Sequence, residues 1–503
     1  MDVWNNLLLG FSNALAPQYL LLALIGVILG TLVGVLPGLG PATTVAMLLP
    51  LTFLFEPIGA FVMFAGVYYG AMYGGSTTAI LLNIPGETAS VPTTFEGHTM
   101  AKRGRGGAAL ATAAIGSFVA GTISTIAITV SASALASLAK LIQPAEYFAI
   151  MVLAFVTVSA ILGASVARGL GSLSIGLAIG LIGIDSLTGQ ARYAFGIAEL
   201  YDGIAIVTIA VGIFAIGEAL YNLIAGRSTN KLVSVKGRVW MTRDEFSRSW
   251  RPWLRGTALG FPIGALPAGG AEIPTFLSYT IERRLSKRRG AKDEFGRGAI
   301  EGVAGPEAAN NAAFSGVLVP LLTLGIPTSA TAGILLIAFQ IYSIQPGPLL
   351  FDTQPVLVWT IIASLYIGNV MLLILNLPMI KLWVKLLTVP REVLTACILV
   401  FAILGVFAAT RNPTEVLIAL AFGVIGVLLR LAEFPIAPLI LGALLGPLME
   451  LHLRRALTLS GGDFSVLFTR PISVTILALS VAALVAPVVW RRIKSRRHGT
   501  TRF

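Results

Sequence analysis

Two stretches rich in Pro and Gly interrupt apolar sequence, and each carries groups that could bind a carboxylate or a cation. The first is LPGLGPATT at 36–44 and the second is LPAGGAE at 266–272. Where a helix is broken, free N–H groups attract carboxylates, while free carbonyl and hydroxyl oxygens can hold Na+. The glycines expected to let backbone approach a substrate are Gly38, Gly40, Gly269 and Gly270. The side chains expected to add oxygens are Thr43, Thr44, Ser76, Thr77, Thr78, Thr328 and Ser329. Asn83, directly before the Ile-Pro-Gly sequence at 84–86, is a further candidate for substrate binding. The alternative is that these glycines only allow helices to pack closely.

A second cluster consists of Glu307, Asn310 and Asn311, whose spacing places an acid and two amides on one helix face. Beside an apolar run such groups are costly unless they are paired or hydrated, so a functional role is the default interpretation. We expect Glu307 to couple transport to an ion and the two amides to contact substrate. The alternative is a cap at a helix end, with Pro306 in the first turn.

Two further acids are candidates for ion coupling. Glu87 follows the Ile-Pro-Gly sequence at 84–86, and Glu272 lies at the second break. The alternative role for Glu272 is an ion pair with a nearby cation.

Catalytic and cofactor motifs are absent from the sequence. It contains no G-x-x-x-x-G-K-[ST] pattern, so the chain is not expected to hydrolyse ATP. His98, His452 and His498 are scattered and Cys397 is the single cysteine, a pattern that predicts neither a zinc nor a haem site. We expect no enzyme activity, no cofactor and no metal apart from transported Na+. The expected coupling ion is Na+ or H+.

Composition places these groups in a membrane protein. Of 503 residues, 56% are hydrophobic and only 12% are charged, against about 25% charged in soluble domains. At about 20 residues a span, the length allows roughly ten to twelve transmembrane segments. The net charge of +12 lies in loops between apolar runs rather than on one face, so nucleic acid is not an expected partner. The expected partner is the lipid bilayer. The predicted fold is an all-α polytopic membrane protein.

The two breaks predict re-entrant or broken-helix hairpins. The runs 19–36 and 41–55 are each too short to cross a bilayer core comfortably. The segment 256–282 has strongly basic flanks on both sides, so a hairpin that enters and leaves on the cytoplasmic face explains it better than one crossing. The first break has no cation on either flank, which predicts entry from outside. Two opposed hairpins are typical of an inverted repeat.

The expected organisation has four parts. Residues 1–226 form an N-terminal membrane repeat, 227–255 a basic cytoplasmic connector, 256–490 a C-terminal membrane repeat, and 491–503 a basic tail. There is no Lys or Arg before Lys102, so we expect a periplasmic N-terminus and a cytoplasmic C-terminus. This orientation places Arg454, Arg455 and Arg470 in an outside loop. That conflicts with the charge rule, by which Lys and Arg concentrate in cytoplasmic loops.

The chain resembles the large membrane subunit of the tripartite tricarboxylate transporter family. The resemblance rests on long motifs in order at 34–53, 68–87, 267–287, 298–331 and 460–473. Three short differences are PAGG at 267–270, GPE at 305–307 and IPT at 326–328, where the family often has PGAG, APE and IPG. They leave the family assignment intact and fall in segments expected to form the binding site.

The resemblance implies a secondary transporter of the bacterial inner membrane that imports small tri- or dicarboxylates. It also implies two partners, a small membrane subunit and a periplasmic solute-binding protein, and an ion gradient as the driving force. The alternative is a stand-alone ion-coupled transporter or channel for organic anions. An integral-membrane enzyme would need clustered Asp or His residues, which the sequence does not show.

Overall fold

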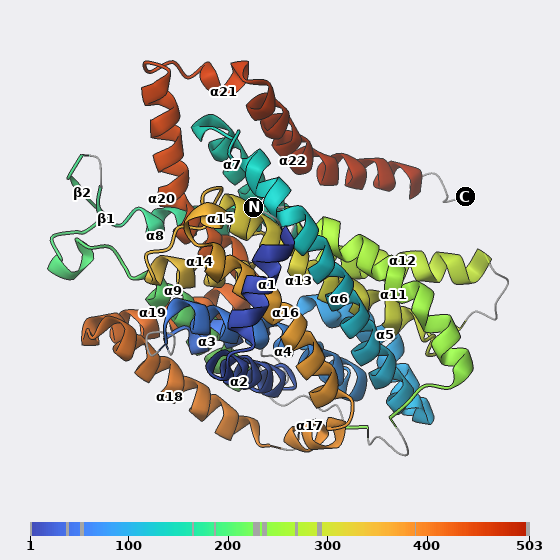
Figure 1. Ribbon diagram of the computed structural model, residues 1–503. Helices are drawn as coiled ribbons and strands as arrows, with labels where there is room; N and C mark the ends of the chain where they lie inside the picture. The colour runs from blue at the N-terminus through green and yellow to red at the C-terminus, as the bar shows by residue number, and fades with distance from the viewer. Residues whose placement is uncertain are drawn as a thin grey trace.

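The computed structural model is built almost entirely of helices (Figure 1). It describes residues 3–36, 40–50, 55–162, 165–185, 188–224, 232–233, 239–266, 270–288, 294–387 and 389–498. Within them, eight helices are long and apolar enough to cross a membrane, and four shorter apolar helices accompany them. The chain is therefore an all-α polytopic membrane protein, as its composition predicts.

The elements of the first half end at the connector before Arg243. They are α1 (Val3–Ala14), α2 (Pro17–Gly34), α3 (Pro41–Leu48), α4 (Pro57–Leu82), η2 (Thr88–Ser90), α5 (Val91–Met100), η3 (Ala101–Arg105), α6 (Gly106–Ala139), α7 (Pro144–Leu162), α8 (Val166–Gly180), β1 (Gly183–Ile184), β2 (Ala191–Arg192), η4 (Ala198–Leu200), α9 (Ile206–Ala210), η5 (Val211–Ile216) and α10 (Gly217–Ile224). Strands β1 and β2 pair antiparallel in a short ribbon that projects from the helices (Figure 1).

The second half begins inside the basic connector. Its helices are α11 (Arg243–Gly264), α12 (Glu272–Arg288), α13 (Glu301–Leu324), α14 (Ala330–Ile341), α15 (Leu350–Thr353), α16 (Pro355–Asn376), α17 (Ile380–Leu386), α18 (Arg391–Thr410), α19 (Pro413–Leu431), α20 (Ile436–Leu459), α21 (Val466–Thr469) and α22 (Pro471–His498). Helix α11 starts this early because Thr242 and Glu245 form a reciprocal capping box at its N-terminus.

Helices α2 and α4 run parallel and in close contact. Methyl groups at Gly26, Gly30 and Gly34 of α2 would lie only 2.2–2.3 Å from the carbonyl oxygens of Met63, Val67 and Ala71 respectively. Because contacts advance along both helices in the same direction, the chain between them must return to the side from which α2 started. Tyr19 at the start of α2 donates to the Glu56 carboxylate just before α4, at 2.5 Å. Segment 17–56 is therefore a re-entrant hairpin, with α3 as its short returning limb.

The second break repeats this arrangement. Methyl groups at Gly256, Gly260 and Gly264 of α11 would lie 2.3–2.4 Å from the carbonyl oxygens of Gly305, Ala309 and Ala313 on α13. Contacts again advance in the same direction, so α12 carries the chain back. Small residues at four-residue spacing are what allow two helix backbones to approach this closely.

The two hairpins enter from opposite sides. Tyr69 hydroxyl lies 3.2 Å from Ser315 Oγ, whereas Ser76, further along α4, donates to the earlier residue Glu307 on α13 at 2.9 Å. Helices α4 and α13 are therefore antiparallel. Since each is parallel to the first limb of its own hairpin, α2 and α11 also run in opposite directions. The inverted repeat expected from charge follows from these contacts.

The two ends of the bundle differ in charge. We define the basic end by Arg105, Arg248 and Arg255, which pair with Glu245, Glu301 and Glu282 respectively. We define the opposite end by Lys140, at the far end of α6, which pairs with Asp352 at 2.6 Å. The first hairpin starts from the Lys140 end and the second from the basic end.

Two of the three arginines that conflict with the charge rule are held by acids at the Lys140 end. Arg454 pairs with Asp185 and with Glu450, and Arg470 pairs with Glu146. Glu146 is buried, and its helix α7 packs along α22. These pairs tie α20 to the segment after β1, tie the start of α22 to α7, and neutralise both guanidinium charges locally.

Candidate functional site

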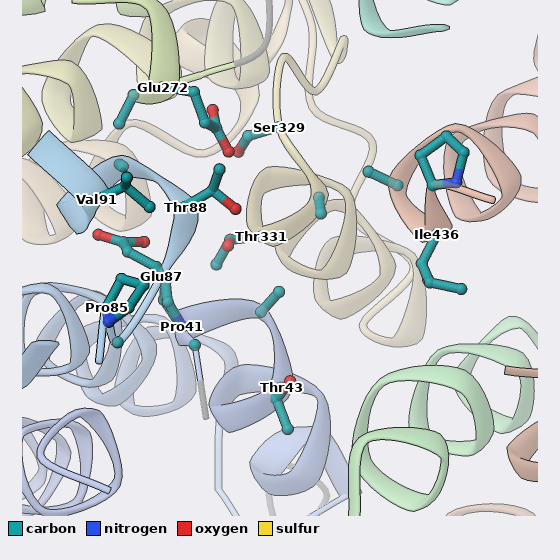
Figure 2. A pocket seen from close by; sticks show the side chains of 18 of the residues that line it. Pro41, Thr43, Pro85, Glu87, Thr88, Val91, Glu272, Ser329, Thr331 and Ile436 are labelled. Atoms are coloured by element: carbon teal, nitrogen blue, oxygen red, sulfur yellow. The ribbon is translucent and has the colours of Figure 1, made fainter. Parts of the chain in front are cut away.

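A cavity of about 1100 Å³ lies where the two breaks meet. The first break contributes Gly40 to Thr43, and the second contributes Ala271 and Glu272. Two segments that follow the long helices, Pro85–Ala89 and Ser329–Thr331, also line it. Figure 2 shows Glu272 beside Ser329, with Glu87, Thr88 and Thr331 on the same cavity wall.

The local sequence explains why these segments reach the cavity. Asn83 directly follows α4 and Gly325 directly follows α13, and both are in the left-handed conformation, with φ of 57° and 69°. An Ile-Pro pair follows each, so neither helix can continue. The turn after α4 brings Gly86 against Gly75 and Gly34. The turn after α13 brings Thr328 within hydrogen-bond distance of the Gly264 carbonyl, at 3.2 Å.

The cavity extends toward the basic end. Helix α12, which runs from the break to the basic end, lines it as far as Thr280, and α10 adds Tyr221. At the Lys140 end, α3 and α14 contribute only their first residues. Beyond them Phe61 and Phe339 pack with ring centroids 4.0 Å apart, and Tyr342 donates to the Phe55 carbonyl at 3.0 Å. The cavity is thus closed by packed side chains toward the Lys140 end.

A buried carboxylate network lies next to the cavity. Glu307 is 1% exposed, and its two oxygens accept from Ser76 Oγ at 2.9 Å and Thr93 Oγ1 at 2.5 Å. Asn310 Nδ2 donates to Glu87 Oε1 at 2.8 Å, which joins this network to the cavity wall. No cation in the described part of the chain pairs with Glu87, Glu272 or Glu307.

The network also contains acceptors that lack donors. Asn310 Oδ1 and Asn311 Oδ1 are buried without a hydrogen-bond partner among the described residues. Asn311 uses its amide nitrogen on Ser117 Oγ at 2.7 Å and on the Glu307 carbonyl. A buried acceptor left unpaired costs about 1–3 kcal/mol, and an unpaired buried carboxylate costs more. Such a surplus of oxygens is chemically suited to a proton or a small cation.

The structure places the predicted site residues in three groups. Gly40, Thr43, Glu87, Glu272 and Ser329 line the cavity. Ser76, Thr77, Glu307, Asn310 and Asn311 are buried in α4 and α13. The remaining described ones are Thr44, Asn83, Gly270 and Thr328, which bond to backbone or occupy left-handed positions at turns. Gly38 and Gly269 lie outside the described residues.

Sequence reasoning missed three residues that the structure brings to this region. Glu218 and Arg430 line the cavity and pair with each other, and Thr93 donates to Glu307. Glu218 and Arg430 carried a usable signal, because ionisable residues within apolar runs are functional candidates. Thr93 carried none, since it lies in a polar segment and its partner is far along the chain.

No group of three or more His, Cys, Asp or Glu in the described residues is arranged to hold a metal ion. The backbone and hydroxyl oxygens at the breaks are a different kind of donor set, suited to Na+ rather than to a tightly held transition metal.

Comparison with known proteins identifies the chain. The model of the tripartite tricarboxylate transporter TctA family matches residues 20–441. An Agrobacterium vitis protein described as an uncharacterized 52.8 kDa protein in the TAR-I ttuC' 3' region is 47% identical over 499 residues, covering 99% of this chain and 98% of its own. A second A. vitis protein, from the TAR-II ttuC' 3' region, is 46% identical over 239 residues, 47% of this chain and 97% of its own. No solved structure matches the chain. The chain belongs to the tripartite tricarboxylate transporter TctA family and is a multi-pass membrane transporter.

Proposed function

We propose that the chain is the large permease subunit of a binding-protein-dependent secondary transporter that imports small tri- or dicarboxylates. The family match supports the transport class and the existence of partner subunits. The cavity between two opposed hairpins supports a substrate site at the repeat interface, where inverted-repeat transporters bind their substrates.

The observation that carries the coupling mechanism is the buried network around Glu307. Its carboxylate has hydroxyl donors but no cation partner in the described chain, and the oxygens of Asn310 and Asn311 lack donors. Entry of Na+ or H+ would relieve this surplus of negative and acceptor groups. Asn310 also donates to Glu87 on the cavity wall, so ion binding in the network would change the surroundings of the substrate site.

In this proposal the substrate lies between the two breaks. Gly40 and the N-terminus of α3 would present backbone N–H groups to a carboxylate, while Thr43 and Ser329 would add hydroxyls. Glu272 at the second break would contribute to ion binding. The hairpins would move against each other to expose the site alternately to the two sides.

We place the protein in the bacterial inner membrane with the basic end in the cytoplasm, because cytoplasmic loops carry the excess of Lys and Arg. A small membrane subunit and a periplasmic solute-binding protein would complete the system. A stand-alone transporter or channel for organic anions is the alternative, and uptake by this chain alone would favour it.

Proteoliposome uptake tests the proposal. The permease, its small subunit and its binding protein would be reconstituted, and uptake of labelled citrate, succinate and malate would be followed under a Na+ or H+ gradient. We expect gradient-dependent uptake in the wild type and its loss in Glu307→Gln and Asn310→Ala, with both variants folded. Uptake only when ATP is supplied would refute secondary transport. Wild-type uptake in both variants would refute the coupling site.

A further inference from the structure

The cavity wall contains one cation among the residues that the structure describes. Arg430, in the last turn of α19, lines the cavity together with Glu87, Glu272 and other polar groups. Its guanidinium pairs with Glu218 of α10 and lies over the ring of Tyr221, 5.7 Å from the ring centroid. Both partners line the same cavity.

Close packing of two helices brings this pair together. Gly212 in η5 lies against the Ala419 carbonyl of α19, and Gly426 lies against the Ile213 carbonyl. Element η5 is a π-helical segment directly before α10, and such segments are frequent at functional sites. The position of Arg430 is therefore fixed by backbone contacts and not by the ion pair alone.

The guanidinium is only partly used. Arg430 Nε is buried and has no hydrogen-bond partner among the described residues, while Glu218 binds the terminal nitrogen NH2. A buried donor without an acceptor is costly, so a purely structural ion pair leaves part of this residue unexplained. Nε and NH2 form one edge of the guanidinium, the edge that binds a carboxylate through two parallel hydrogen bonds.

The other charged groups of the wall are acids, which repel an anionic substrate. Glu433 pairs with Arg168, whereas Glu87 and Glu272 have no cation partner among the described residues. Arg430 is the described side chain whose charge and geometry both suit a carboxylate.

We propose that Arg430 binds a carboxylate of the transported anion, and that Glu218 is its counter-ion while the cavity is empty. The assignment rests on the proposed carboxylate transport and adds the residue that recognises the charge. An arriving carboxylate displaces Glu218 from NH2 and then bonds to NH2 and to the unpaired Nε together. Tyr221 keeps the guanidinium plane in place during the exchange.

Direct binding tests the assignment. Isothermal titration calorimetry would measure citrate and succinate binding to the full-length permease in nanodiscs, with neutral trimethyl citrate as the uncharged comparison. Loss of a charge-assisted contact of this kind weakens binding roughly ten- to a hundredfold, which we expect for Arg430→Gln. Arg430→Lys keeps the positive charge but loses the two parallel N–H donors. Its affinity is expected to lie between those of Arg430→Gln and the wild type. Glu218→Gln is expected to bind as tightly as the wild type or more tightly.

Arg470→Gln is the matched control, because Arg470 also pairs with a buried acid, Glu146, but is not among the cavity-lining residues. The double variant Glu218→Gln/Arg430→Gln removes both charges and guards against misfolding from one unpaired charge. We expect it to fold and to bind as weakly as Arg430→Gln.

Wild-type affinity in Arg430→Gln, or equal binding of citrate and trimethyl citrate, would overturn the assignment. So would full recovery of binding in a Glu218→Arg/Arg430→Glu swap, since that outcome requires only a structural pair. No binding to the wild type up to about 10 mM would also overturn it. If wild-type uptake in the reconstituted system persists in these cases, the transport proposal stands and only the role of Arg430 falls.

Discussion

At the scale of single residues, the environment of Glu307 is set by two hydroxyl donors from distant parts of the chain. Ser76 lies in α4, and Thr93 lies in α5, the helix that returns from the cavity. Thr93 is itself buried, so its hydroxyl cannot be replaced by bulk water when it is removed. Without the Thr93 hydroxyl, the Glu307 carboxylate would keep its position but lose one of its two hydrogen-bond donors.

Thr93→Val removes this hydroxyl with little change of shape. A hydrogen bond to a charged group contributes about 1.5–3 kcal/mol, so the apparent affinity for the coupling ion is expected to change roughly ten- to a hundredfold. The measurement is uptake as a function of Na+ concentration and of pH. Thr94→Val is the matched control, because Thr94 donates to the Val91 carbonyl and not to Glu307. Equal ion dependence in the two variants would remove Thr93 from the coupling network.

At the scale of elements, both hairpins pack through glycine-lined contacts, and the second also has ion pairs at the basic end. Gly30 faces the Val67 carbonyl and Gly260 faces the Ala309 carbonyl at equivalent places in the two repeats. A methyl group at either position would lie within 2.3 Å of a backbone oxygen, so backbone would have to move.

Gly30→Ala and Gly260→Ala are each expected to destabilise the protein by about 1–3 kcal/mol, the usual cost of overpacking. Thermal unfolding in detergent, followed by size-exclusion chromatography, measures this. Gly368→Ala in α16 is the control, because its nearest neighbour would be a Val27 methyl group at 3.8 Å, an ordinary contact. If all three variants unfold at one temperature, the hairpin contacts are looser than the structure indicates.

At the scale of the whole molecule, the cavity reaches toward the basic end and is closed toward the Lys140 end. With the basic end in the cytoplasm, this is an inward-facing arrangement. Thr280 lines the cavity on the α12 limb of the second hairpin, whereas Ser137 lies on the last turns of α6, next to Lys140. The two positions therefore report opposite sides of the membrane.

Labelling with a membrane-impermeant maleimide checks this orientation. In a Cys397→Ala background, Thr280→Cys is expected to react in inside-out vesicles and Ser137→Cys in right-side-out vesicles. Saturating substrate would slow the reaction at Thr280→Cys because the cavity would be occupied. The opposite pattern of sidedness would invert the topology and place the cavity mouth in the periplasm.

Much of the fold was determined by local sequence. The Pro/Gly breaks, the apolar runs and the basic flanks of 256–282 depend on properties of neighbouring residues, and a bilayer turns such properties directly into geometry. The inverted pair of hairpins followed from them. Five predicted residues line the cavity, and all of them lie at those breaks or just after the Ile-Pro pairs at 84–85 and 326–327.

Only the tertiary structure decided which side chains meet. Thr93 with Glu307, Asn310 with Glu87, and Glu218 with Arg430 each join residues more than two hundred positions apart. Their pairing depends on the rotation and depth of the packed helices, which glycine contacts in several elements fix. A periodic pattern within one helix contains no information about that register. The sequence therefore determined where this chain breaks in the membrane, and packing decided which charges face one another across the cavity.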